Sequence, residues 1–156
     1  MKSRYIPLIL LLVFTSCGTQ DVCDGDNQSI LVARFKTTTT GDITDTIVPG
    51  ISIFGIREGK TDSLLYDSID VARIELPLDP ANGQSRFIMT VADERDTLIF
   101  THTSEAYLIS YTCGFAARFT LEDFNATGGM IVDTELISAS IDAELESNEE
   151  HLWIYF

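Results

Sequence analysis

The side chains that most often carry out catalysis are sparse in this sequence and form no familiar catalytic pattern. His102 and His151 are the only histidines, and neither lies in an H-E-x-x-H or Cys/His arrangement that binds zinc. A G-x-S-x-G turn, a glycine-rich phosphate loop and a dinucleotide fingerprint are also missing. The acidic pair Glu149 and Glu150 could serve acid–base chemistry, but among 24 acidic residues such neighbours arise by chance. We therefore expect a protein that is not an enzyme and uses no cofactor or metal.

The charge balance is strongly acidic. Of the 156 residues, 24 are Asp or Glu and 10 are Lys or Arg, which gives a formal net charge of −14. No basic stripe is present to neutralise phosphates, which argues against a nucleic-acid partner. The hydrophobic fraction of 45% is too high for a wholly disordered acidic chain, and the length fits one ordinary domain.

Residues 1–16 have the layout of a secretory signal peptide. Lys2 and Arg4 precede an almost unbroken apolar run from Ile6 to Phe14, and small residues follow. The run is roughly half of the ~18–20 residues that a membrane-spanning helix needs. We therefore expect residues 1–16 to be removed on export. Their removal takes away two positive charges and leaves 24 acidic and 8 basic side chains, a charge of −16.

The end of this segment, Phe14-Thr15-Ser16-Cys17, resembles the lipobox of bacterial lipoproteins, although Phe14 stands where Leu is commonest. The resemblance implies that Cys17 becomes the first mature residue and is alkylated with diacylglycerol. Several acyl chains, at ~0.8 kcal/mol per buried methylene, hold a protein stably on a membrane without any basic patch. We expect an exported protein that is lipid-anchored to the outer membrane, on its periplasmic face or at the cell surface.

The remaining cysteines suggest one disulfide. Three Cys are present, and assigning Cys17 to lipid leaves Cys23 and Cys113. Disulfides persist in exported compartments, and closing a loop of roughly 90 residues would stabilise the fold by about 4–5 kcal/mol on the chain-entropy model. A Cys23–Cys113 bond is therefore expected, with two unpaired thiols as the alternative.

Residues 17–28 are polar and acidic, and we interpret them as a short lipidated tether. Asp21, Asp24, Asp26 and Asn27 offer oxygen ligands of the kind that calcium prefers. Their order does not match the EF-hand loop, so a solvated linker is the simpler interpretation.

Residues 29–156 show the signature of a β domain. Apolar residues alternate in short runs rich in β-branched and aromatic side chains, which indicates an all-β, two-sheet sandwich rather than βαβ units. The clearest strands are expected near residues 31–35, 51–56, 71–76, 86–92, 97–102, 106–113 and 151–156. Turns are expected at residues 49–50, 58–60, 80–83 and 92–94.

We expect the sandwich to be immunoglobulin-like. Tyr111, two residues before Cys113, is similar to an immunoglobulin tyrosine corner. However, Cys23 precedes the first expected strand and no Trp lies between the two cysteines, which argues against a true antibody-type domain.

One segment fits two interpretations. Ile137, Ile141 and Leu145 are spaced as on one face of a helix, whereas Ile137, Ala139 and Ile141 alternate as in a strand. The β-branched residues and the flanking sequence favour a strand.

Several short stretches together are similar to one family. They are CDGDN at 23–27, LPLDP at 76–80, DTLIFTH at 96–102, YTCGF at 111–115 and NEEHLWIYF at 148–156. In this order they resemble an uncharacterised Bacteroidota lipoprotein family, domain of unknown function 6452. The resemblance implies a small exported β domain and supplies no catalytic residues.

Several aromatic side chains could together bind a ligand. Trp153 and Tyr155, with Tyr107 and Tyr111, could form a platform on which a sugar stacks, although their alternating spacing is also that of ordinary sheet packing. Our leading expectation is a membrane-anchored, exported, non-catalytic interaction or structural module of the cell envelope, whose partner is an envelope protein or a glycan. A glycan-binding accessory lipoprotein is the alternative. The sequence gives no indication of the oligomeric state.

Overall fold

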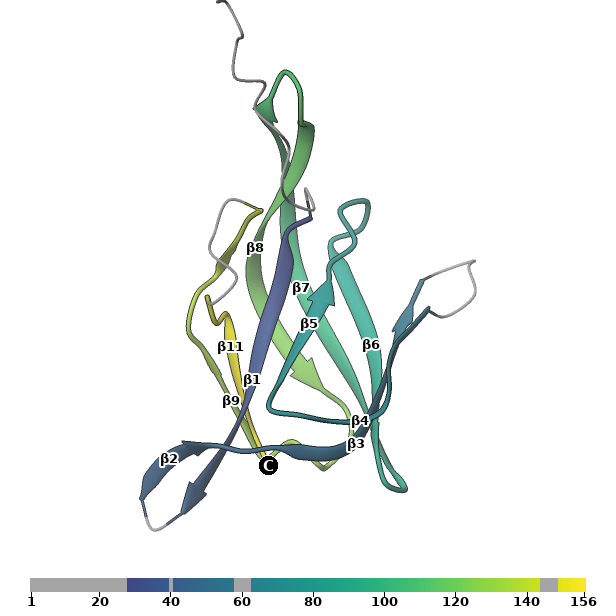
Figure 1. Ribbon diagram of the computed structural model, residues 1–156, viewed down its shortest axis with the longest axis vertical. Helices are drawn as coiled ribbons and strands as arrows, with labels where there is room; N and C mark the ends of the chain where they lie inside the picture. The colour runs from purple at the N-terminus through teal and green to yellow at the C-terminus, as the bar shows by residue number, and fades with distance from the viewer. Residues whose placement is uncertain (1–27, 40, 58–62, 144–148) are drawn as a thin grey trace, which may run out of the picture.

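The structure is a computed structural model that describes residues 28–39, 41–57, 63–143 and 149–156. Within these ranges the regular structure consists of strands alone. The strands form two sheets that pack against each other around one apolar core (Figure 1). The expected all-β, two-sheet sandwich is confirmed.

The first sheet contains the two ends of the described domain. Its strand order is β2 (Asp42–Asp45), β1 (Ile30–Thr39), β11 (Leu152–Tyr155), β9 (Asp133–Leu136), and β5 (Arg73–Pro77) pairs with the first half of β1. β1 and β11 run parallel, in register from Ala33 opposite Leu152 to Lys36 opposite Tyr155. The expected closing strand at the C-terminus is therefore confirmed, and it is held against the first strand.

The second sheet is antiparallel throughout. Its strand order is β10 (Ser140–Ile141), β8 (Gly114–Ala126), β7 (Glu94–Ser110), β6 (Gln84–Val91), β3 (Val48–Ile56), β4 (Ser63–Val71). The runs expected as separate strands at 97–102 and 106–113 are one strand of 17 residues, β7, which ends at Ser110.

The prediction of a turn at Pro49-Gly50 is wrong, because both residues lie inside β3. Gly50 adopts a φ of +61°, and the pairing of β3 with β4 shifts register between Val48 and Ile51. The chain therefore uses the glycine for an irregularity within a strand rather than for a reversal of direction. The turns expected at 80–83 and 92–94 do separate strands, and the one at 58–60 lies outside the described residues.

The segment that fitted two patterns follows one short strand and contains another, and the two strands belong to different sheets. β9 ends at Leu136 and pairs with β11, whereas β10 pairs with β8 through Ser140 and Ile141. Ile141 is buried in the core. The strand interpretation is confirmed for Ile141, whereas Ile137 and Ala139 lie in the irregular connection between β9 and β10, and Leu145 lies outside the described residues. The chain crosses between the two sheets here, which the alternation did not indicate.

Alternate side chains from both sheets fill the core. Phe35 and Phe100 are fully buried, and Phe87 meets Phe100 edge-on with ring centroids 5.8 Å apart. The last residue, Phe156, packs edge-on against Phe35 at 5.3 Å. Edge-to-face contacts of this kind add to the free energy of area burial, so the C-terminus is held by aromatic packing as well as by strand pairing.

A buried carboxylate fixes the connection between β8 and β9. Asp96 is 1% exposed and accepts hydrogen bonds from the backbone N–H groups of Gly129 and Ile131, at 2.8 and 3.3 Å. A Cβ atom added at Gly128 would lie 0.9 Å from the Asp96 carboxylate oxygen, so the chain can pass this close only as glycine.

Replacing Asp96 with Ala should lower the free energy of unfolding by about 2–3 kcal/mol, because two backbone donors lose a charged acceptor. Urea denaturation measures the loss. The exposed carboxylate of Asp93 in the preceding turn provides the matched control, since Asp93→Ala should stay within about 0.5 kcal/mol of the wild type. Equal midpoints for the two variants would contradict the role assigned to Asp96.

Candidate functional site

The most prominent surface feature is a hairpin that projects beyond the sandwich. β7 and β8 pair from Leu98 opposite Ala126 to Ser110 opposite Gly114, and their upper part extends past the other strands (Figure 1). Burial alternates along β7 as far as His102 and then stops, whereas on β8 it continues to Ala116, which is 6% exposed. The β7–β8 ladder thus packs into the core at the end near Leu98 and projects from it at the end near Ser110.

The tip of this hairpin is held by local interactions. Tyr111, Thr112 and Cys113 form the turn, and Gly114 follows in the left-handed region with a φ of +77°. The Ser110 hydroxyl accepts a hydrogen bond from the Cys113 N–H at 3.0 Å. A three-residue loop followed by a left-handed glycine is a common hairpin geometry, so this sequence shapes its own turn.

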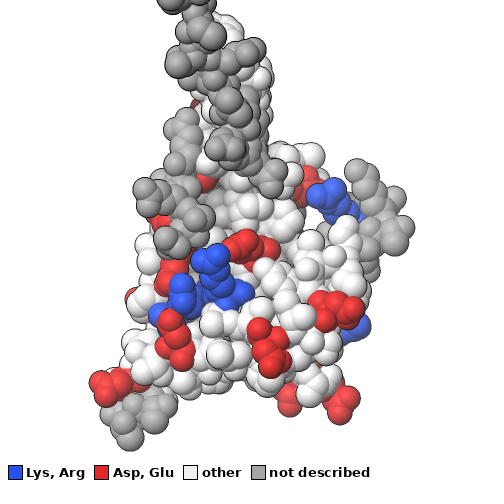
Figure 2. Space-filling model, in the orientation of Figure 1, with Lys and Arg blue, Asp and Glu red and all other residues white. Residues whose placement is uncertain are grey.

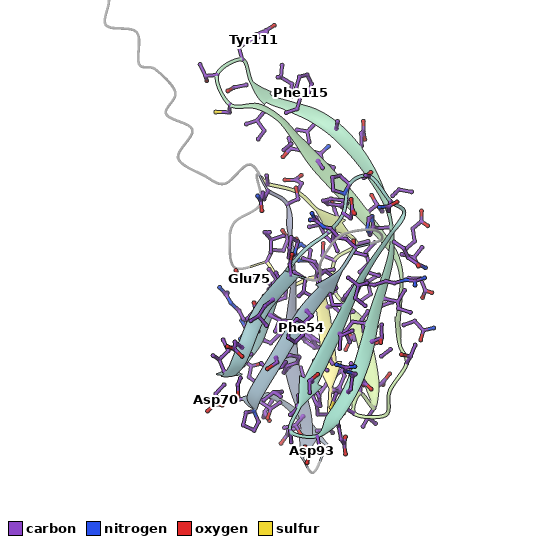
Figure 3. All side chains as sticks on the ribbon, turned by 90° about the vertical axis from the view of Figure 1, so that its right-hand side faces the viewer. Phe54, Asp70, Glu75, Asp93, Tyr111 and Phe115 are labelled. Carbon is purple, nitrogen blue, oxygen red and sulfur yellow. The ribbon has the colours of Figure 1, made fainter. Side chains whose placement is uncertain are left out.

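Large apolar side chains are exposed on the tip. Tyr111 is 99% exposed, Phe115 72% and Leu108 43%. Figure 3 shows Tyr111 and Phe115 at the end of the hairpin. Residues 106–121 contain no Asp or Glu, and their one charged side chain, Arg118, is paired with Asp142 at 3.0 Å and lies over the Tyr107 ring. We refer to Leu108, Tyr111 and Phe115 as the apolar tip.

The described chain begins at the base of the hairpin. The Ser29 hydroxyl donates a hydrogen bond to the Ala117 carbonyl of β8. Gln28 and Phe115 both line a cavity of about 290 Å³ beside this contact. The residues that lead into β1 therefore reach the domain at the end from which the apolar tip projects.

Most of the residues for which the sequence predicts processing, lipidation or a disulfide lie outside the described residues. They are the signal peptide at 1–16 and the tether at 17–28 apart from Gln28, which together include Cys17 and Cys23. Cys113 lies half-buried in the turn of the hairpin. Lipidation of Cys17 and the Cys23–Cys113 bond thus stay predictions.

The structure brings together only part of the expected aromatic platform. Trp153 and Tyr155 lie on β11 in the first sheet, whereas Tyr107 and Tyr111 belong to the hairpin of the second sheet. The Lys36 ammonium lies 4.2 Å from the centre of the Trp153 ring, which places a cation on one face of the indole.

The polar atoms of both β11 aromatics are hydrogen-bonded. The Trp153 indole N–H donates to Glu150 at 2.5 Å, and the Tyr155 hydroxyl donates to Glu135 at 3.1 Å. Figure 2 shows basic side chains gathered among acidic ones on this face. Ion pairs on this face join Arg34 to Asp45 and Glu150, Lys36 to Asp45, and Arg73 to Glu75. Sugar binding at Trp153 and Tyr155 stays a prediction.

One polar pair was not anticipated from the sequence. Ser85 on β6 and His102 on β7 meet in the interior, with the hydroxyl oxygen 2.9 Å from Nε2. Such a pair could activate a nucleophile if a third group oriented the histidine. Among the described residues, however, His102 Nδ1 has no hydrogen-bond partner, and the Ser85 hydroxyl already accepts the Asp79 N–H at 2.8 Å. Both side chains are buried, so we interpret the pair as one that fastens the 79–85 turn to the sheet.

Both histidines have a lowered pKa, and burial is the main cause. The carboxylates of Asp79 and Glu122 oppose this effect at His102, and Glu149 opposes it at His151. His151 Nδ1 accepts the Val32 N–H at 3.0 Å, an interaction that requires this nitrogen to be unprotonated. The folded protein therefore holds both rings in their neutral form.

The unfolded chain should take up protons near the ordinary histidine pKa of 6.5, at a pH where the folded chain does not. Stability is therefore greatest above that pH and falls as the pH is lowered below it, by up to about 1.4 kcal/mol per pH unit for each ring. Urea unfolding between about pH 7 and pH 5 should show a shallower fall in the double variant His102→Gln, His151→Gln. An identical slope in the variant and the wild type would refute this origin of the pH dependence.

The described residues contain no group of three or more His, Cys, Asp or Glu side chains that could hold a metal ion. They also contain no helix long and apolar enough to cross a membrane.

Comparison with known protein families gives a match. The model of a family of unknown function (DUF6452) matches residues 50–156, from within β3 to Phe156, and so includes the whole projecting hairpin. No curated protein matches the sequence, and no solved structure matches the fold. The immunoglobulin-like arrangement accordingly stays a prediction.

Proposed function

Because the chain belongs to a family of unknown function, DUF6452, whose description carries no activity, we propose a function from its own residues. The protein is an exported, lipid-anchored, non-catalytic interaction module of the cell envelope. Its anchor is the lipidated Cys17 and its contact element is the β7–β8 hairpin.

The observation that carries this proposal is the apolar tip. Large apolar side chains that are exposed together usually mark a contact with another molecule, because water solvates them poorly. Here they lie at the end of a rigid projection, on a chain that is otherwise strongly acidic. The interior, by contrast, holds its polar groups in structural pairs such as Asp96 with the β8–β9 connection.

Two features support the anchor. The segment that precedes Cys17 has the charged start, short apolar middle and small residues of an export signal. A mature charge of −16 would be repelled by anionic envelope surfaces, and a covalent lipid holds the protein there without basic residues.

The intact mass of the protein purified from membranes should correspond to a chain that begins at Cys17 and carries diacylglycerol. Cys17→Ala should lack the added mass and should not be cleaved before residue 17. Cys23→Ala, six residues further on, is the matched control and should be lipidated normally. A mature chain with an unmodified Cys17 would overturn the anchoring proposal.

The module also contains a Cys23–Cys113 disulfide under this proposal. Cys113 is not a free thiol, which supports the bond, and exported proteins keep disulfides oxidised. Such a bond fastens the segment just after the anchor to the turn of the hairpin.

Peptide mapping without reductant should recover Cys23 joined to Cys113. Cys113→Ser should lower the free energy of unfolding by about 2–5 kcal/mol, because the denatured chain loses its cross-link. Wild-type protein unfolded in the presence of reductant serves as the control and should show a similar loss. Alkylation of both thiols in the unreduced protein would show that the bond is absent.

A further inference from the structure

We infer that the apolar tip docks on the lipid bilayer that carries the anchor, so that Leu108, Tyr111 and Phe115 lie at the level of the lipid headgroups. This inference rests on the proposed anchoring through Cys17 and names the partner of the hairpin. Three independent features of the molecule lead to it: the chemistry of the tip, the distribution of charge, and the position at which the chain enters the domain.

The first feature is the kind of side chain at the tip. Tyrosine has an apolar ring and a polar hydroxyl, and aromatic residues of this kind are enriched where membrane proteins cross the lipid–water interface. Tyr111 is almost fully exposed in the turn, close to Phe115 on β8 (Figure 3). Leu108 on β7 pairs with Phe115 across the ladder. A bilayer interface takes up such a mixed set without the shaped pocket that a protein partner would need.

The second feature is charge. Residues 106–121 lack Asp and Glu altogether in a chain with 24 of them, and Arg118 supplies the segment's one formal charge. At the opposite end of the domain, the β6–β7 turn exposes Asp93 and Glu94 (Figure 3). An anionic bilayer repels acidic surfaces, so the acid-free hairpin approaches it at a lower electrostatic cost than the β6–β7 turn does.

The third feature is the geometry of the anchor. Ten residues lie between Cys17 and Gln28, and the eleven peptide units that join the two residues span at most about 40 Å. Gln28 lies at the base of the hairpin, and the four residue steps from Ala117 back to Cys113, at the turn, cover about 13 Å of it. The tether is therefore long enough for the tip to reach the bilayer in which the lipid is embedded.

The rigidity of the tip favours docking. The Ser110 hydroxyl and the left-handed Gly114 already fix the turn, and the ladder behind it continues into the core. Little conformational freedom is lost when such an element binds, so a small apolar area is enough to hold it against a surface to which the chain is already tethered.

Tryptophan fluorescence in vesicles tests this docking. Tyr111→Trp places a reporter at a side chain that is 99% exposed, so the substitution leaves the packing of the domain unchanged. The full-length protein, purified in its lipidated form, is inserted into vesicles of phosphatidylethanolamine and phosphatidylglycerol, with or without bromine on the acyl chains. Bromine quenches only those indoles that lie within the bilayer or at its interface.

We expect the added tryptophan of Tyr111→Trp to lose emission in the brominated vesicles and to emit at shorter wavelength than in detergent-free buffer. The wild-type protein reports Trp153 alone, which lies on β11 beneath the Lys36 ammonium, and should show no loss. Asp93→Trp, which places the reporter in the exposed turn at the far end of β7, should also show none.

Each remaining outcome is decisive. If the chain carries its lipid and Tyr111→Trp is not quenched, the docking inference is wrong although the anchor stands, and a protein partner or a second copy must cover the tip. Equal quenching of Asp93→Trp would also overturn it, because the domain would then lie flat on the bilayer. If intact mass shows no lipid on Cys17, the proposed function fails and the docking inference fails with it.

Discussion

The antiparallel ladder between β7 and β8 is the interaction on which the rest of this molecule depends. In its lower part, side chains such as Leu98, Phe100 and Phe119 supply the centre of the core. In its upper part the same hydrogen-bonded pairs continue past the sandwich to the exposed turn at Tyr111. The projection is therefore stiff because its other end is buried, and any loss of core packing would also release the tip.

The acidic residues and the apolar tip occupy different parts of the protein. The acids keep much of the surface hydrated and away from anionic partners, whereas the apolar tip lies in a stretch, residues 106–121, that contains no Asp or Glu. On the first sheet, Lys36 and Arg34 pair with Asp45 and lie beside Trp153 and Glu150. The Asp45 side chain is half-exposed, so its pairs with Arg34 and Lys36 add little stability, but they hold the side chains of that face in one arrangement.

Most of the strands could be predicted because the signal for a strand is local. Alternation at 31–35, 86–92 and 152–156 reflects a side-chain period of two, which each segment carries by itself. Pro49-Gly50 misled the prediction because the same dipeptide suits a turn and an irregular strand, and only the pairing of β3 with β4 distinguishes them. The Ser85–His102 pair was missed because the two residues come from different strands and meet only through the β6–β7 register.

By itself, the sequence determined the class of fold, the acidity of the chain and the acid-free stretch at 106–121, because all three are properties of residue type and local spacing. Tertiary structure alone decided that this stretch forms a hairpin clear of the core and that Lys36 lies over Trp153. It also decided that the chain enters beside the hairpin, through the Ser29–Ala117 hydrogen bond. Strand neighbours and register are set by contacts between residues that are distant in the sequence. A local pattern of residue types therefore does not indicate with which distant strand a segment will pair.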